Sequence, residues 1–282
     1  MSTTEERIRE LVENFSERLS KVLRDPTPEH VHKLRVSARR YNAAVEYGAQ
    51  RIKKKQQNHL DDLEQLRRKA GKVRDLDIEL ALLNDINGDS QSGVEVAALA
   101  EFIARKRQRQ VKKLSTEGVR LRSNRLLDHM ETIGEKAVSS GQLDGSSALV
   151  EAQSRLAKLA EKSRQHPNPK PARLHKTRVE LKMIRYLAEL ASESPAQTQL
   201  LESLKGVQDV LGKWHDWESL AQTAEKFFDT NPNSFLPEQV RSLAESHRRE
   251  AVRGAAEFLA GLNPSKKLPQ RAKVQRSVVV SA

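Results

Sequence analysis

Apolar residues recur every three or four positions along most of the chain, which is the spacing of amphipathic helices. Near the N-terminus, Ile8, Phe15 and Leu19 fall on one face of a predicted helix, and Pro28 suits the first turn of the next. Strand patterns are almost absent, because sustained Val, Ile and Thr alternation occurs nowhere except in the terminal stretch SVVVSA. The pattern therefore predicts an all-α protein.

Glycines and proline-rich stretches divide the predicted helices. Gly71 and Gly212 each predict a stop or a sharp bend. Residues 94–139 are predicted as one long helix or as a hairpin that turns near Gly118, and the last helix is predicted over 237–261. In all, the pattern indicates about ten helices.

Two motifs occur twice in the same order. HKLRV at 32–36 matches HKTRV at 175–179, and LRRKAGKVRDLD at 66–77 matches VQDVLGKWHDWE at 207–218. The first pair is offset by 143 residues and the second by 141. Two motifs with nearly the same offset indicate an internal duplication.

The duplication predicts the domain organisation. We expect two related helical halves, at about 1–140 and 141–262, packed in a single domain over residues 1–262. Residues 263–282 are basic and rich in proline for their length, which predicts a disordered tail.

Each copy of the first motif carries a row of cations beside its apolar stripe. At about 100° per residue, Leu34, Ala38 and Tyr41 share one face of the first helix, and Leu181 and Ile184 share the equivalent face of the second. The cations lie on the adjacent arc, not opposite to the apolar stripe. These candidate binding residues are His32, Arg35 and Arg39 in the first row and His175, Arg178, Lys182 and Arg185 in the second.

Such rows have two interpretations. They could be ordinary solvated cations whose stems cover apolar surface, with Asp75 and Asp216 as ion-pair partners or helix caps. Alternatively, the two rows could face one another across a cleft, where their mutual repulsion would be relieved by a polyanion. The duplication favours the binding site, because a solvated face rarely needs the same residue types twice.

Composition narrows the class of ligand and the compartment. The chain has 50 Lys and Arg against 38 Asp and Glu, a formal net charge of +12, which attracts polyanions without choosing among them. It has no Cys, which excludes disulfides and thiolate metal sites. The N-terminus lacks the apolar run of a signal peptide, and no stretch approaches the roughly 20 apolar residues of a membrane span. We expect a soluble, cytoplasmic protein.

Metal binding is not expected. No spacing such as H-E-x-x-H occurs, and His215, in the stretch WHD, aligns with Arg74, which does not bind metal. We therefore predict neither a metal nor another cofactor.

The motifs HKLRVSARR, GKVRDLD, HKTRVELKMIRY and VQDVLGKWHD, in this order, resemble the CHAD family, the conserved-histidine α-helical domains. The resemblance implies two four-helix-bundle-like halves, related by a pseudo-two-fold axis, around a central basic channel that binds inorganic polyphosphate. This sequence departs from the family pattern at Asn42 and Met183, where family members usually have a basic residue. By motif match, the binding residues would be His32, Arg35, Arg39, Arg40, His175, Arg178, Lys182 and Arg185.

Three functions follow from these observations. The first is non-catalytic polyphosphate binding by a stand-alone domain in the cytoplasm, with targeting to polyphosphate granules. The second is nucleic-acid binding, which the charge allows but the few aromatic residues disfavour. The third is a polyphosphate-cleaving enzyme, which would need a carboxylate cluster or a Gly-rich phosphate loop that the sequence does not show. The sequence predicts no oligomeric state.

Overall fold

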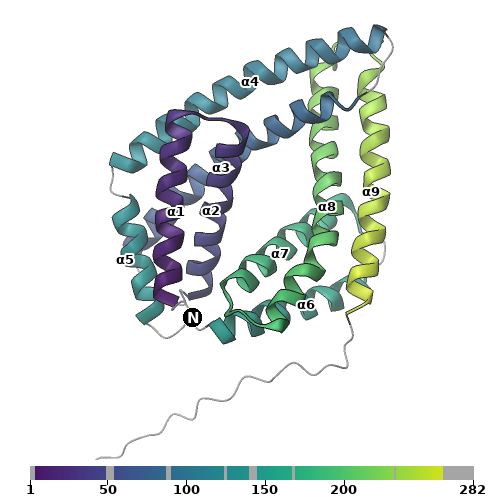
Figure 1. The fold of residues 1–282 in the computed structure, drawn as a ribbon. Coiled ribbons are helices and arrows are strands. Elements are labelled where there is room, and N and C mark those ends of the chain that lie inside the picture. The colour runs from purple at the N-terminus through teal and green to yellow at the C-terminus, as the bar shows by residue number, and fades with distance from the viewer. Residues whose placement is uncertain are drawn as a thin grey trace, which may run out of the picture.

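The computed structural model describes residues 4–48, 54–86, 90–123, 126–139, 145–166, 169–231 and 233–262. These residues form nine α-helices and no strand, which confirms the all-α prediction (Figure 1). The predicted tail at 263–282 lies outside the described residues. The helices are α1 (Thr4–Arg24), α2 (Pro28–Gly48), α3 (Lys54–Leu83), α4 (Ser90–Ser123), α5 (Leu126–Ser139), α6 (Gly145–Arg164), α7 (Pro171–Leu190), α8 (Pro195–Phe227) and α9 (Leu236–Ala260).

The expected breaks at Gly71 and Gly212 are wrong. Helices α3 and α8 run through these glycines without interruption, so the described residues hold nine helices instead of about ten. A glycine inside a helix costs only about 1 kcal/mol relative to alanine. Burial of apolar residues on both sides, such as Val73 in α3 and Trp214 in α8, offsets that cost.

Neither alternative for residues 94–139, one long helix or a hairpin that turns near Gly118, matches the structure, because α4 continues past Gly118 to Ser123 and α5 begins at Leu126. Gly118 has a packing role instead. A Cβ atom placed there would lie 3.0 Å from Leu23 Cδ2 and 3.1 Å from Leu19 Cδ1, so the glycine lets α4 approach α1 closely.

Three large hydrophobic clusters and a small fourth one, at Ile8 and Ala44, hold the helices together. One lies among α1, α2, the first part of α3, the end of α4 and α5. A second lies among α6, α7, the first part of α8 and the end of α9. A third joins the far end of the α3–α4 pair to the far end of the α8–α9 pair, where Figure 1 shows these long helices meeting. This third cluster thus joins the first and second parts of the chain at one side of the molecule.

The helices have the same neighbours in both parts of the chain. In the first part, α1 packs on α2 and α4, and α3 packs on α2 and α4. In the second part, α6 packs on α7 and α9, and α8 packs on α7 and α9. Helix α5 has no counterpart among the described residues of the second part. This order is consistent with the two predicted halves.

Contacts between equivalent helices join the two parts. Helix α2 packs on α7 and α3 packs on α8, so the two helices that carry the basic rows are direct neighbours (Figure 1). Arg7 of α1 adds a polar link, since its Nη1 donates to the carbonyl oxygens of Leu190 at 3.0 Å and Ala191 at 2.6 Å. These bonds satisfy carbonyls at the end of α7 that no helical N–H can reach.

We expect Gly134→Ala to lower the free energy of unfolding by about 1–3 kcal/mol through overpacking. A Cβ at Gly134 would lie 2.2 Å from Cγ2 of the buried Ile8, where α5 crosses α1. Urea denaturation would measure the effect, and Ile8→Ala should partly rescue it in the double mutant. The control is Gly93→Ala, because a Cβ there meets nothing within 4 Å. Equal stabilities of the two Gly→Ala variants would contradict this account.

Candidate anion-binding site

The contact between α2 and α7 positions the two basic rows. The apolar stripes predicted for these helices are confirmed, since Leu34, Ala38 and Tyr41 of α2 and Leu181 and Ile184 of α7 are buried. Each stripe faces the hydrophobic cluster of its own part. The cations on the adjacent arc of each helix are therefore held against two apolar cores.

Arg35 and Arg178 occupy equivalent positions in the two rows and share an unusual environment. The side chain of Arg178 is only 7% exposed, and that of Arg35 is half-buried. In both residues Nε is buried and has no hydrogen-bond partner among the described residues. Buried polar groups are normally hydrogen-bonded. The Nε1 atoms of Trp214 and Trp217 are also buried without a partner, but Arg35 and Arg178 carry charge and occupy equivalent positions, which makes this pair a candidate for binding an anion.

Gly71 contributes to this arrangement from α3. A Cβ atom at this glycine would lie 3.6 Å from Nε of Arg35. The bare backbone of α3 therefore passes beside the Arg35 guanidinium. At the equivalent Gly212 of α8, an added Cβ would meet nothing within 4 Å, so α8 leaves open space at this point.

The electrostatics show that the rows lie within reach of each other. Burial lowers the pKa of Arg35 to about 10, and repulsion from Arg39 and Arg178 adds to this, while Asp75 opposes it. Burial also lowers the pKa of Arg178, where attraction from Asp216 opposes repulsion from Arg39. Cations of α2 and α7 thus destabilise each other's charged forms.

Among the cations of the two rows, Lys182 is the one whose pKa this environment moves close to neutral pH. Burial lowers its pKa to about 7, and repulsion from Arg178, Arg39 and Arg35 adds to the effect. Asp216 attracts its charge but does not restore the pKa to the usual value of 10.5. The Lys182 ammonium therefore loses its proton near neutral pH in the free protein.

The histidines of the two motifs lie at the edge of the cluster, with exposed side chains. Partial burial still lowers the pKa of His32 below 6.5, with added repulsion from Arg74 and Arg35. Partial burial likewise lowers the pKa of His175, with repulsion from Arg178 and Lys182. Both rings are thus mainly neutral at pH 7 in the free protein.

The structure adds residues that the sequence reasoning did not assign to the site. His215 of α8 lies with its ring centroid 5.2 Å from that of His175, and burial with repulsion from Arg178 lowers its pKa to about 3. The charge of Arg74, in α3, helps to lower the pKa of His32 and opposes the rise in the pKa of Asp216. The alignment of Arg74 with His215, directly before the duplicated aspartates, was the signal that could have found them.

Arg40 and Arg185 have different surroundings from the other six candidates. Arg40 Nε lies 2.8 Å from Glu189 Oε2, and Arg185 Nε lies 3.0 Å from Glu189 Oε1. Arg185 Nη1 also donates to Gln208 Oε1 at 3.2 Å. Glu189 thus neutralises one cation from α2 and one from α7, and links the two helices. The structure brings together His32, Arg35, Arg39, His175, Arg178 and Lys182, and holds Arg40 and Arg185 in a separate ion-pair network.

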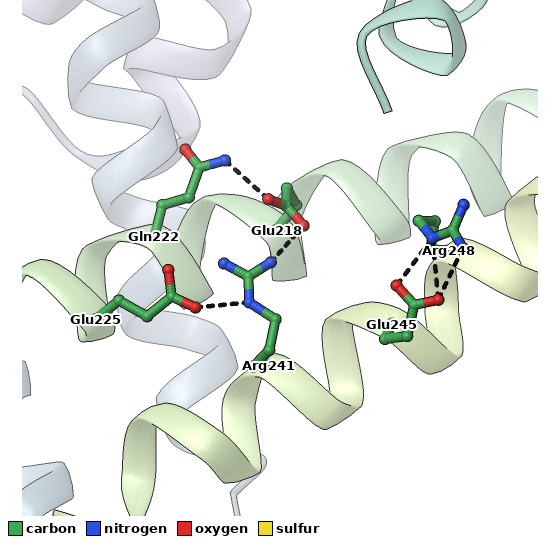
Figure 2. Close-up of polar contacts among 6 residues, drawn as sticks. All are labelled: Glu218, Gln222, Glu225, Arg241, Glu245 and Arg248. Atoms are coloured by element: carbon green, nitrogen blue, oxygen red, sulfur yellow. Dashed lines mark hydrogen bonds and ion pairs between the residues drawn. The ribbon is translucent and has the colours of Figure 1, made fainter. Parts of the chain in front are cut away.

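Arginines elsewhere show the ordinary arrangement. Figure 2 shows Arg241 of α9 between Glu225 and Glu218 of α8, with Nε–Oε1 at 2.6 Å and Nη1–Oε2 at 2.8 Å. In the same view Arg248 donates three hydrogen bonds to Glu245. Hydrogen bonds to these carboxylates raise the pKa of both arginines. Arg241 and Arg248 thus differ from Arg35 and Arg178, whose pKa values are lowered by burial and by neighbouring cations.

The described residues hold neither a cluster of metal-binding side chains nor a membrane-spanning helix. No three His, Asp or Glu side chains among them come together in a way that could hold a metal ion. None of the described helices is long and apolar enough to cross a membrane.

Comparisons with known proteins agree with the helical arrangement. The family model of the CHAD domain matches residues 6–225, so the chain belongs to the CHAD domain family. Its fold is similar to the crystal structure of the CHAD domain from the plant Ricinus communis, with a TM-score of 0.72 and 19% sequence identity. That match covers 94% of this chain and 92% of the plant chain. Comparison with curated proteins gives no match.

We expect Lys182→Met to raise the free energy of unfolding by about 1–3 kcal/mol at pH 6, because it removes a half-buried cation that Arg178, Arg39 and Arg35 repel. Between the folded pKa of about 7 and the ordinary value of 10.5, the unfolded chain binds one more proton, so the stability of the wild type rises with pH. The gain should therefore shrink at pH 9. Urea denaturation at both pH values measures it.

The matched control for this substitution is Lys176→Met, on the exposed side of the same helix. It should change the stability little at either pH. A gain from Lys182→Met that is equal at pH 6 and pH 9 would contradict the lowered pKa.

Proposed function

We propose that this CHAD domain binds inorganic polyphosphate, without cleaving it, through the cations that α2 and α7 bring together. The observation that carries the proposal is the pair of buried Nε atoms of Arg35 and Arg178, which lack hydrogen-bond partners at equivalent positions. The remaining ligands would be Arg39, Lys182 and the two motif histidines. Arg40 and Arg185 would take part only if a phosphate displaced Glu189.

The charge arrangement suits a linear polyanion. Each cation of the cluster raises the free energy of its neighbours' charged forms, and a phosphate between the rows would reverse the sign of these interactions. Arginine offers a planar fork for phosphate oxygens and lysine offers a point charge. A chain with about one negative charge per phosphate could therefore bridge the rows from α2 to α7.

Aspartates behind the cations have a supporting role in this proposal. Asp75 attracts Arg35 and Arg178, and Asp216 attracts Arg178 and Lys182. Burial raises the pKa of Asp216, whereas the nearby cations oppose that rise. We infer that the two carboxylates reduce the repulsion within the cluster without occupying the donors that would meet phosphate.

The aromatic residues favour polyphosphate over nucleic acid. Trp214, Trp217 and Tyr41 are at most 5% exposed and offer no surface on which bases could stack, so the half-buried Tyr186 is the aromatic residue beside Arg35 and Arg178 that is partly exposed. Phe235 is 64% exposed but precedes α9, at the end of the molecule where the third hydrophobic cluster lies. Sequence-independent binding of single strands usually needs such stacking near the cations.

We expect Arg35→Ala/Arg178→Ala to weaken the binding of polyphosphate of defined length at least tenfold at low salt, because each arginine would supply charge-assisted hydrogen bonds. Isothermal titration calorimetry measures this change. The control is Arg241→Ala/Arg248→Ala, which removes the same charge from arginines that are paired with carboxylates (Figure 2). Circular dichroism would verify that both variants fold.

Three results would contradict the proposal. Equal weakening by the two double variants would show a diffuse charge effect. Displacement of polyphosphate by DNA at equal phosphate concentration would reverse the preference for polyphosphate. Release of phosphate in the presence of Mg²⁺ would show catalysis.

We expect polyphosphate affinity to fall about tenfold from pH 6 to pH 8, because the free protein loses the Lys182 proton near pH 7 and binding must restore it. Calorimetry in two buffers of different ionisation enthalpy would detect uptake of about one proton near pH 7.5. Lys182→Arg should bind at both pH values and remove most of the dependence. His32 and His175 should add proton uptake toward pH 6, because their pKa is lowered in the free protein and a bound phosphate would raise it. An unchanged pH dependence in Lys182→Arg would assign it to another group.

A further inference from the structure

A second basic feature lies on the outer side of α6, α7 and α9. It is a groove of about 950 Å³ whose floor includes Leu159, Val252 and Leu259. Cations surround this apolar floor, and their side chains are exposed to solvent. They are Lys158, Lys162, Lys170, Arg173 and Lys176.

This groove is separate from the cluster between α2 and α7. At about 100° per residue, Arg173 and Lys176 lie on the opposite side of α7 from Arg178. The carboxylate in its lining is Glu180, which lies 3.8 Å from Arg155 Nη1. Arg155 also pairs with Glu151 at 3.0 Å, so it is neutralised and the other five cations determine the charge of the rim.

A comparison with the first half explains why the second half has a groove at this place. The first motif, with its offset of 143 residues, matches Thr177 to Leu34. For α1 and α6, an offset of 141 residues places the buried Leu156 and Ala160 on the buried Phe15 and Leu19, and so matches Ser163 to Val22. Val22 and Leu34 are 0% and 1% exposed and belong to the hydrophobic cluster of the first half. Ser163 and Thr177 instead line the groove. Smaller, polar side chains thus stand where the first half fills its core.

The same comparison explains the charge of the rim. In the first half, Lys21 pairs with Glu17 at 2.5 Å and Lys33 pairs with Glu29 at 2.5 Å. The corresponding lysines of the second half, Lys162 and Lys176, have no carboxylate four residues before them. Lysine 158 stands at the position of Glu17, and Ala172 stands at the position of Glu29. The second half has therefore replaced two neutralising carboxylates with a cation and a methyl group.

We propose that this groove docks an acidic amphipathic helix of a partner protein. Docking would place apolar residues at positions i, i+3, i+4 and i+7 on the floor and carboxylates against the rim. The lining residues of α6 run from Arg155 to Ser163, about 12 Å along the helix axis, which matches a docked segment of about two helical turns. An inorganic polyanion would gain nothing from the apolar floor, so the groove differs in chemistry from the α2–α7 cluster.

The positive charge of the chain's own tail makes it an unfavourable occupant of the groove. Residues 263–282 contain five Lys and Arg and no Asp or Glu, so the rim would repel them. The proposal is independent of polyphosphate binding, because none of the residues assigned to the α2–α7 cluster lines the groove.

The test uses a fluorescein-labelled 18-residue peptide with Leu at helical spacing and Glu at the remaining positions. Fluorescence anisotropy should show saturable binding to the full chain. A peptide of the same composition, with the Leu residues placed so that no apolar face forms, should bind at least tenfold more weakly. Polyphosphate binding should be unaffected by saturating amphipathic peptide.

Two variants give the second half the features of the first. Ser163→Val/Thr177→Leu should fill the hollow and Lys158→Glu should restore a carboxylate, and each should weaken peptide binding at least tenfold. The control for charge is Lys21→Glu on α1, which should leave peptide binding unchanged. Circular dichroism and retained polyphosphate binding would show that the variants fold.

Several outcomes would overturn the proposal. Equal binding of the two peptides would show attraction by charge alone. Unchanged binding in both groove variants would place the peptide elsewhere. Displacement of the peptide by polyphosphate in Arg35→Ala/Arg178→Ala would make the groove a second polyanion site. Binding of phosphatidylglycerol vesicles that the groove variants abolish, with no peptide binding, would assign the surface to a membrane.

Discussion

Repulsion among the cations that α2 and α7 bring together is the constraint on which this molecule depends. Arg35, Arg178 and Lys182 each have a pKa below the ordinary value, because they are partly buried beside other cations. Hydrophobic clusters on both sides supply the free energy that holds them in place. The third cluster, between the α3–α4 and α8–α9 pairs, fixes the far ends of the same helices. The fold therefore maintains a charge arrangement that would separate without these cores.

Carboxylates are distributed so that some cations are neutralised and others are not. Glu189 pairs with Arg40 and Arg185 and links α2 to α7 at one end of the rows. Asp75 and Asp216 attract the charges of the remaining cations, but they accept no hydrogen bond from Nε of Arg35 or Arg178. The molecule thus combines a structural ion-pair network with a set of donors that stays available. A cluster neutralised throughout would be more stable and would bind anions less well.

The two parts of the chain share helix neighbours but differ in their surfaces. In the first part, α5 packs on the bundle, and paired lysines cover α1 and α2. In the second part, Ser163 and Thr177 replace core residues and Lys158 replaces a carboxylate. A helical scaffold tolerates such changes because its stability comes mainly from the apolar stripe of each helix. One arrangement of helices therefore carries a cluster of cations between α2 and α7 and a basic groove with an apolar floor on α6, α7 and α9.

The sequence by itself determined the helical class, the apolar stripes of α2 and α7, and the row of cations beside each stripe. These features depend on periodicity, which is local, and on a duplication that can be read directly from HKLRV and HKTRV. Tertiary structure decided the rest. It showed that Gly71 and Gly212 lie inside long helices, since packing on both sides outweighs their weak helix propensity. It also separated Arg40 and Arg185 from the other candidates, because their partner Glu189 is identified only when α2 lies against α7.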